Sequence, residues 1–265
     1  MEVIDHGVCR LALVSVRKDP NDLSQQVTQL LFGDHYEVTN VSEDKKWTYI
    51  RIHADLYEGW ISEKQHHSIT KEFFVQINHA NYKISTDLTS SLLYKKSPLT
   101  ILIGSIVPIS NSELFRMEEQ FAFNGESKSL GQKRDFEFLR FIAFKYLNAP
   151  YQWGGKSPFG IDCSGFTQLI FKISGYQLLR DASQQANHGK KVKDISDAQP
   201  GDLAFFKNTE GQIVHVGLIL EDEKIIHASG KVRIDHLMEE GILNSESKIY
   251  THYLASIRRI LSSNS

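Results

Sequence analysis

Residues 160–167, Gly-Ile-Asp-Cys-Ser-Gly-Phe-Thr, place a cysteine where a protein chain can activate it as a nucleophile. The apolar run Phe166–Phe171 follows, and Gly175 ends it, so the pattern predicts one buried helix that begins at or next to Cys163. Unpaired N–H groups and the helix dipole favour an anion at that end. We therefore expect a lowered thiol pKa, and the thiolate is the reactive form. A lone cysteine in an apolar helix is more often a core residue, so this interpretation needs partner residues elsewhere.

Two histidines supply such partners. Three segments downstream have the composition of β-strands: 202–206, 214–220 and 224–230. His215 lies in the second of them, on the face opposite Val214 and Val216, and His227 lies in the third. Neighbouring strands can bring a general base and its orienting partner together. A cysteine with separated histidines that meet only in the fold is typical of cysteine-nucleophile hydrolases.

Six short motifs follow one another in a characteristic order. They are Tyr-Gln-Trp-Gly-Gly at 151–155, Asp-Cys-Ser-Gly-Phe at 162–166, Arg-Asp-Ala-Ser-Gln-Gln at 180–185, Gln-Pro-Gly-Asp-Leu at 199–203, His-Val-Gly at 215–217 and His-Ala-Ser at 227–229. This set resembles the NlpC-type (NlpC/P60) family of bacterial cell-wall cysteine peptidases, over roughly residues 133–260. The resemblance implies a papain-like catalytic domain.

The parts predict a mechanism. Cys163, as a thiolate, attacks an amide carbonyl, and His215, as an imidazolium, keeps it ionised and later protonates the leaving amine. His227 fixes the tautomer of His215. The resemblance suggests the Cys163 backbone N–H and the Tyr151 hydroxyl as donors to the oxyanion.

The resemblance also implies a substrate. Most relatives cleave the γ-D-glutamyl bond to a diamino acid in peptidoglycan stem peptides, by way of a thioester. Residues that match the positions around L-Ala-γ-D-Glu, in the subgroup with SH3-like N-terminal domains, are Tyr151, Trp153, Asp162, Ser164 and Asp181. The expected substrate is a stem peptide with a free N-terminal L-Ala, and the expected enzyme is a monomer without cofactor or metal. The sequence leaves lysine and diaminopimelate open at the third position.

Recognition of the substrate amine is expected from the N-terminal half. Tyr57 is the candidate contact there, and Asp22, Asp55 and Glu58 are possible carboxylates. Glutamines occupy positions 25 and 26, where an acidic residue would be expected, so the residue that pairs with the amine stays open.

The N-terminal half consists of short apolar–polar runs without helical periodicity, which favours small β-barrels. The runs at 47–51 and 57–61 resemble a bacterial SH3-like domain, which usually ends on a Gly-Trp-apolar strand. We predict an SH3-like domain at 1–70, a second, divergent one at 71–128 and the catalytic domain at 129–265, with 125–132 as linker. A helix over 135–147 opens the catalytic domain, so the predicted class is α+β.

Composition and charge exclude several classes of partner. Net charge is −2 and the apolar content 41%, so nothing indicates nucleic acid or an anionic membrane as a partner. No apolar stretch approaches the roughly 20 residues that span a bilayer. The acidic residues 1–7 do not read as a secretory leader, which predicts a cytoplasmic enzyme of murein peptide recycling; a periplasmic or extracellular location is the alternative if a leader was removed. Both cysteines fit a reducing compartment, with Cys9 as an inert core residue.

Three other functions stay open at this stage. Cys163, His215 and His227 are acceptable zinc ligands, although they lack the short spacing of usual zinc sites. Sensitivity to a chelator would distinguish that site from a cysteine peptidase. The chain could also bind wall fragments without catalysis, or act as an N-acetylmuramoyl-L-alanine amidase.

Overall fold

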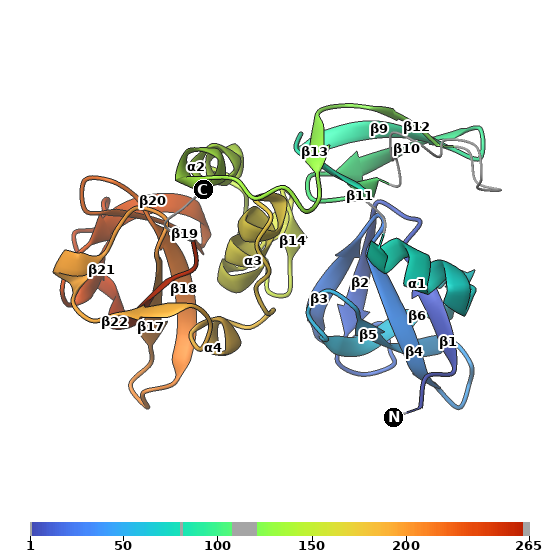
Figure 1. Cartoon of the computed structure of the whole chain (residues 1–265). Helices are drawn as coiled ribbons and strands as arrows, with labels where there is room; N and C mark the ends of the chain where they lie inside the picture. The colour runs from blue at the N-terminus through green and yellow to red at the C-terminus, as the bar shows by residue number, and fades with distance from the viewer. Residues whose placement is uncertain (1, 80–81, 108–120, 262–265) are drawn as a thin grey trace. The chain divides into compact units, whose positions relative to one another are not determined.

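The computed structural model describes residues 2–79, 82–107 and 121–261. The chain forms two compact units (Figure 1). Unit 1 comprises Met1–Gln132 with Gly154–Ser157, and unit 2 comprises Lys133–Trp153 with Pro158–Ser265. The predicted limits at 70 and 128 stay predictions. The described residues form no helix that is both long and apolar enough to cross a bilayer.

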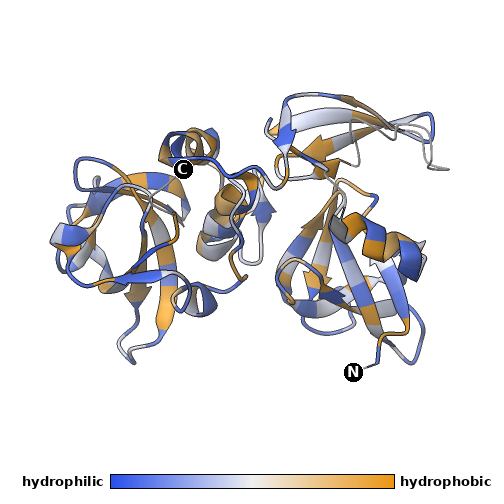
Figure 2. Cartoon of the chain, in the orientation of Figure 1, coloured by the Kyte–Doolittle hydropathy of each residue, from blue (hydrophilic) through white to orange (hydrophobic). Residues whose placement is uncertain are grey.

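The first part of unit 1 is an antiparallel, seven-stranded sheet in the order β3-β2-β6-β5-β4-β1-β7. Its strands are β1 (Asp5–Val8), β2 (Leu13–Arg17), β3 (Gln26–Leu31), β4 (His35–Val41), β5 (Trp47–Ile52), β6 (Glu58–Ser62) and β7 (Ser68–Ile69), with a 3₁₀ turn at Glu63–Gln65. Alternation turns Val14, Val16, Ile50 and Ile52 into a shared apolar core. Figure 2 shows that hydrophobic and hydrophilic segments alternate along the strands of this sheet. The prediction of an SH3-like, all-β region is confirmed. Cys9 is buried in this core, and its burial raises the thiol pKa to about 12.

The second part of unit 1 departs from the prediction at its start. A helix, α1 (Lys71–His79), buries Phe74 and Ile77, although no helix was predicted in this half. The strands that follow form two three-stranded sheets, β10-β9-β12 and β11-β8-β13. Their bounds are β8 (Lys83–Ser85), β9 (Thr89–Tyr94), β10 (Ser97–Leu102), β11 (Ile106–Val107), β12 (Phe121–Asn124) and β13 (Ser127–Ser129). Part of the predicted second SH3-like domain, 80–81 and 108–120, lies outside the described residues.

The predicted linker at 125–132 is wrong. β13 lies inside it and pairs with β8, so polar, glycine-flanked sequence here forms a strand of unit 1. The polar residues belong to an exposed edge, which is why composition alone suggested a linker. The short strand β14 (Lys156–Ser157) also belongs to unit 1, where the Lys156 N–H donates to the Gln29 side chain at 2.7 Å.

Unit 2 is an α+β domain, as predicted. Helices α2 (Phe136–Lys145), α3 (Cys163–Ile173) and α4 (Ala182–Gln185) and the strand β15 (Gly160–Ile161) come first. A sheet follows in the order β16-β22-β17-β18-β19-β20-β21, and a further pairing of β21 with β22 closes six of its strands into a barrel. Their bounds are β16 (Lys190–Val192), β17 (Leu203–Lys207), β18 (Ile213–Ile219), β19 (Lys224–Ser229), β20 (Lys231–Leu237), β21 (Gly241–Leu243) and β22 (Tyr250–Arg259), with a 3₁₀ turn at Ile195–Asp197.

The elements of unit 2 have local causes that the sequence shows. Asp135 caps α2 by accepting a hydrogen bond from the Phe138 N–H at 3.1 Å, and the helix buries Leu139 and Ile142. Helix α3 packs on β18 and β19. The predicted strands at 202–206, 214–220 and 224–230 correspond to β17, β18 and β19, within one residue at most ends.

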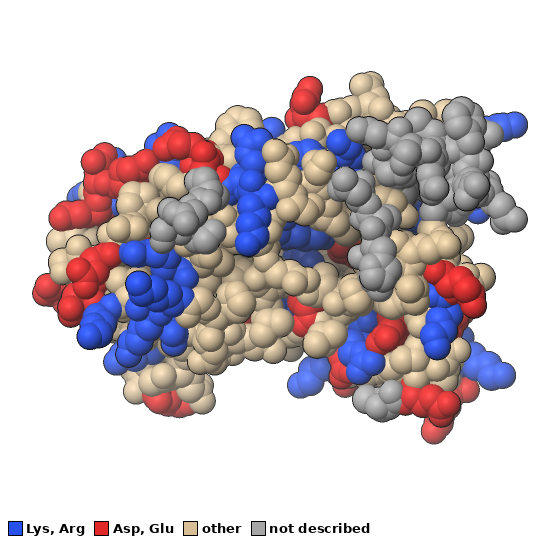
Figure 3. Space-filling model, viewed as in Figure 1, with Lys and Arg blue, Asp and Glu red and all other residues tan. Residues whose placement is uncertain are grey.

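The surface carries charges of both signs. Figure 3 shows acidic and basic side chains interspersed over the visible face, as expected for a net charge of −2.

Candidate active site

Cys163 is the first residue of α3, as predicted. Asp162 is the N-cap, and its carboxylate accepts a hydrogen bond from the Gly165 N–H at 2.7 Å. The N–H of a first helical residue has no acceptor within the helix, so the Cys163 N–H is left for another acceptor. The Cys163 residue itself is only 7% exposed.

A buried arginine fixes this end of the helix. The Arg180 guanidinium donates to both oxygens of Asp162, at 3.0 and 2.6 Å, and to the Ser164 hydroxyl at 2.9 Å. Arg180 is 1% exposed, so this two-bond ion pair lies out of water. The Gln185 side chain adds a bond to the Ser164 carbonyl at 3.0 Å, which ties α4 to α3. The backbone that carries the thiol is therefore held on several sides.

The predicted lowering of the Cys163 thiol pKa is wrong. Burial, reinforced by the charge of Asp162, raises this pKa to about 12. Backbone hydrogen bonds of Val216 and Ser164 and the charge of Arg180 lower it, but not enough to compensate. The helix dipole is a small effect beside the removal of a thiolate from water. The hydrogen bond of Val216 also places the thiol beside β18, next to His215.

His215 and His227 are joined, as predicted, across neighbouring strands. Nε2 of His215 lies 2.8 Å from Nδ1 of His227, and both rings are buried. His227 is directly opposite Gly217 in the β18–β19 register, so the two histidines are diagonal neighbours. Gly217 leaves the space for this contact, because a Cβ there would lie 2.9 Å from the Cβ of His227.

The hydrogen-bonded chain continues to a residue that was not predicted. Nε2 of His227 lies 2.9 Å from Oδ2 of Asp235 on β20, and Asp235 is 1% exposed. Arg233 donates to both oxygens of the same carboxylate, at 2.7 and 3.0 Å. Burial opposes ionisation of Asp235, but the hydrogen bonds of His227, Arg233 and the Ser245 N–H outweigh it and lower its pKa.

Burial favours the neutral form of both His215 and His227. Burial, followed by the charges of His227 and His252, lowers the pKa of His215 well below its usual value. Burial also lowers the pKa of His227, against the opposing effect of Asp235. The predicted resting imidazolium at His215 is therefore wrong, since burial disfavours its charge as it disfavours the thiolate.

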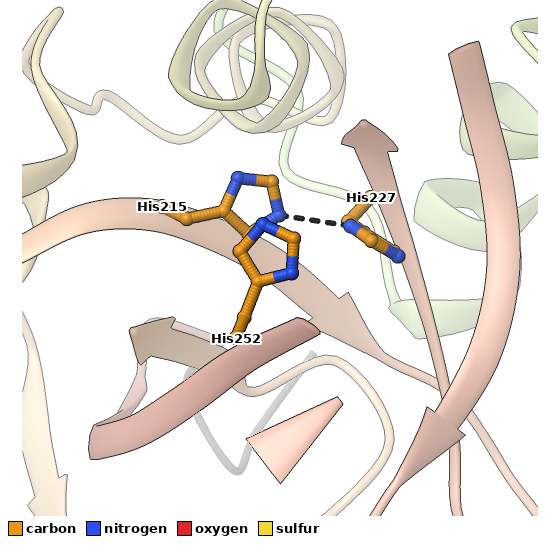
Figure 4. Close-up of side chains that lie close together, drawn as sticks. All are labelled: His215, His227 and His252. Carbon is orange, nitrogen blue, oxygen red and sulfur yellow. Dashed lines mark hydrogen bonds between the residues drawn. The ribbon is translucent and has the colours of Figure 1, made fainter. Parts of the chain in front are cut away.

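A third histidine lies against the first. Figure 4 shows the His252 ring over the His215 ring, with His227 reached by the dashed bond. The His215 and His252 ring centroids are 4.1 Å apart and the planes 26° apart, and burial lowers the pKa of His252 to about 4. The three rings form a group whose nitrogen atoms could hold a metal ion. The zinc hypothesis had Cys163 in the place of His252, and a metal would have to displace the His215–His227 bond.

The residues predicted to bind the substrate differ in their burial and in their contacts. Tyr151 is anchored beside the start of α3 by a backbone bridge to Ile161. Burial and the charges of Cys163 and Asp162 raise its pKa to about 12, so its hydroxyl is a donor. Trp153 is 60% exposed. The Asp181 N–H donates to the Gln184 side chain at 3.1 Å, at the start of α4.

Two predicted residues have structural contacts, and one lies in the other unit. Asp162 and Ser164 both bind Arg180. Tyr57 belongs to unit 1, where it packs partly buried against the apolar core. The roles of all these residues in substrate binding stay predictions.

Sequence reasoning missed Asp235, Arg233, His252 and Arg180. The first two alternate on β20, a pattern that reads as a solvent-facing strand. Only pairing with β19, which sets Arg233 opposite His227, reveals that this face is buried. A signal was available for Arg180, because it stands in one of the six motifs.

Comparison with known proteins identifies the family. Residues 148–253 match the NlpC/P60 family, and residues 16–65 match the bacterial dipeptidyl-peptidase SH3 domain. The chain is 30% identical over 257 residues to a γ-D-glutamyl-L-lysine dipeptidyl-peptidase of Bacillus subtilis, covering 89% of this chain and 81% of the relative. A Bacillus cereus protein of the same name is 29% identical over 262 residues, covering 88% and 75%.

A solved structure shares the fold over nearly the whole chain. The crystal structure of an NlpC/P60 family protein from Bacillus cereus has a TM-score of 0.81 and 22% identity, over 97% of this chain and 100% of that one. With the NlpC/P60 family matched at 148–253, and a relative of this identity matched over most of its length, the chain belongs to the NlpC/P60 family of cell-wall cysteine peptidases.

Proposed function

We propose that this peptidase hydrolyses the γ-D-glutamyl–diamino acid bond of peptidoglycan stem peptides that carry a free N-terminal L-Ala. The observation that carries the proposal is the placement of Cys163 at the start of α3, hydrogen-bonded by the backbone of Val216 on β18, the strand whose His215 bonds to His227, in a protein that matches γ-D-glutamyl-L-lysine dipeptidyl-peptidases across both units. A relative that shared only unit 2 would support hydrolysis but not this specificity.

The neutral state of the pair selects the order of proton transfers. Cys163 Sγ bonds to the carbonyl carbon while its proton moves to His215, which acts as a general base. The imidazolium formed then donates that proton to the leaving amine, and the C–N bond breaks to give a thioester. Water attacks the thioester carbon while His215 takes its proton; the C–S bond then breaks, His215 returns that proton to Cys163 Sγ, and the new carboxyl group is released. His215 is thus charged only during the reaction.

The oxyanion needs donors that already point toward it. The Cys163 backbone N–H is available at the helix start, and the Tyr151 hydroxyl stays protonated because its pKa is about 12. We assign these two groups to the oxyanion.

A free α-amine in the substrate fits the name of the relatives, since a dipeptidyl-peptidase removes two residues from an N-terminus. L-Ala acquires a free amine only after the stem peptide has left its glycan, so the substrate is a released fragment. Trimming such fragments is murein peptide recycling.

Mass spectrometry of defined peptides tests the proposal. L-Ala-γ-D-Glu-L-Lys, its diaminopimelate counterpart and the N-acetylated form of each are incubated with wild type and with Cys163→Ala. We expect L-Ala-γ-D-Glu to be released from the free-amine peptides only, and only by wild type.

Each alternative has its own outcome in the same assay. Release from the N-acetylated peptides at an equal rate would refute recognition of the amine. Cleavage of a muramoyl-L-Ala bond in a muropeptide, with the tripeptide left intact, would establish an amidase. No cleavage of any of these, together with measurable binding, would establish a wall-fragment binding protein.

A further inference from the structure

Asp235 is a buried carboxylate at the far end of the hydrogen-bonded chain that runs from His215 through His227. It is 1% exposed, and it accepts from His227, twice from Arg233 and, at 2.7 Å, from the Ser245 N–H. A buried carboxylate is retained only where such partners compensate its charge. In the register of β19 with β20, Asp235 lies diagonal to His227, so its effect is exerted on the His227 ring.

We infer that Asp235 is a positioning residue that sets the tautomers of both histidines and so leaves a ring nitrogen of His215 free to take the proton of Cys163. The inference rests on the proposed function for its peptide assay, but not for its chemical assay below.

The assignment follows from counting protons. A carboxylate only accepts, so Nε2 of His227 carries the proton at the 2.9 Å contact. A neutral imidazole holds one N–H, hence Nδ1 of His227 is an acceptor, and the 2.8 Å contact requires the proton on Nε2 of His215. Nδ1 of His215 is then left with its lone pair. The carboxylate therefore acts on a nitrogen two rings away.

Arg233 explains why the carboxylate does not also charge the rings. An ionised Asp235 alone would favour an imidazolium at His227, but the guanidinium offsets that charge. The other charged or titratable groups that face these residues are Glu246, 3.6 Å from Arg233, and His252, whose ring centroid is 5.7 Å from that of His227. The Asp235–Arg233 pair thus orients the His227 ring without giving it a second proton.

Two matched variants separate positioning from stability. D235N and R233Q both remove the ion pair, but only D235N removes the carboxylate. In D235N the single amide oxygen is taken by Arg233 and the Ser245 N–H, so the NH₂ group faces His227. Both histidines then switch tautomer, and a proton occupies the nitrogen that has to accept. We expect kcat/KM to fall by roughly 10²–10⁴-fold in D235N, the range known for a misplaced tautomer in a triad, and by less than about 10-fold in R233Q when both are measured at an alkaline pH, where His227 stays neutral without the guanidinium.

Combining D235N with H227Q tests whether the effect of Asp235 reaches His215 through His227. Glutamine in H227Q can turn its oxygen toward His215 whatever residue 235 is, so D235N in that background is expected to cost less than about 10-fold. Equal losses for D235N and R233Q, or an undiminished loss from D235N beside H227Q, would overturn the inference and leave Asp235 a structural residue.

Two further measurements do not depend on the peptide, and the second of them needs no variant. The rate of Cys163 alkylation by iodoacetamide, with C163A as the blank, is expected to fall in D235N but not in R233Q, even if no tested peptide is cleaved. Nitrogen chemical shifts of the wild-type histidines are expected to show both protons on Nε2. A wild-type His215 protonated on Nδ1 would refute the inference even if D235N did not fold.

Discussion

Replacement of Arg180 by methionine tests whether the ion pair at the start of α3 holds the nucleophile in place. The variant R180M keeps the length and apolar stem of the side chain but removes three charge-assisted bonds, two to Asp162 and one to Ser164. It leaves the Asp162 carboxylate, which is 6% exposed, without its cation. Removing one partner of a buried ion pair costs about 3–5 kcal/mol. We expect unit 2 to lose that much stability.

Adding the partner variant D162N completes a double-mutant cycle that measures the coupling between Arg180 and Asp162. Asparagine caps a helix about as well as aspartate, so R180M/D162N keeps the cap and removes the uncompensated charge. We expect the double variant to be more stable than the sum of the two single losses predicts, by about 2–3 kcal/mol.

Native-state hydrogen exchange followed by mass spectrometry measures this unit by unit. Peptides from α3 and β18 report unit 2, while peptides from β4 and β5 report unit 1 and serve as an internal reference. A loss below about 1 kcal/mol for R180M, or strict additivity in the cycle, would show that the buried pair is not what fixes the helix start.

Three other expectations follow from the same site. Because burial raises the Cys163 pKa to about 12, the thiolate absorbance at 240 nm, measured against C163A, is expected to be absent from pH 6 to 9; absorbance throughout that range would demonstrate a resting thiolate. Gly217→Ala would bring a methyl group 2.7 Å from Ile225 and 2.9 Å from His227, and we expect a loss of about 1–3 kcal/mol with reduced turnover, both checked by urea unfolding and peptide cleavage. Burial lowers the His252 pKa from 6.5 to about 4, so the unfolded chain binds more protons than the folded one between those pH values, and unit 2 loses stability as the pH falls through them. His252→Phe is expected to flatten that part of the plot of stability against pH, and an unchanged slope would refute this cause.

The sequence predicts those parts of the fold where one residue pattern has one structural outcome. The apolar run after the N-cap Asp162 favours a buried helix, which is α3, and the apolar run from Val214 favours a strand, which is β18. The short helix α1 was missed because its apolar residues Phe74 and Ile77 cover less than a full helical stripe.

Two errors at the site have a physical cause in tertiary burial. A helix N-terminus does favour an anion, but how deeply the thiol is buried depends on β18, which lies far along the sequence. Likewise, Arg233 and Asp235 read as solvent-facing until β20 is placed beside β19. Spacing predicts which groups meet, whereas their protonation depends on what covers them.

If Cys163 and His215 rest in their neutral forms, the free energy of activation includes the cost of separating their charges. A resting ion pair would already contain the thiolate, and catalysis would only have to stabilise the oxyanion. In the mechanism proposed above, charge separation occurs in the transition state itself, because the proton leaves Cys163 as the bond to carbon forms. Fixed dipoles that match the new charges are therefore most valuable: N–H and O–H donors on the oxyanion side, and the hydrogen-bonded chain through His227 to Asp235 on the imidazolium side. A substrate that excludes water from Cys163 strengthens each of these interactions, so binding and activation of the nucleophile are one event.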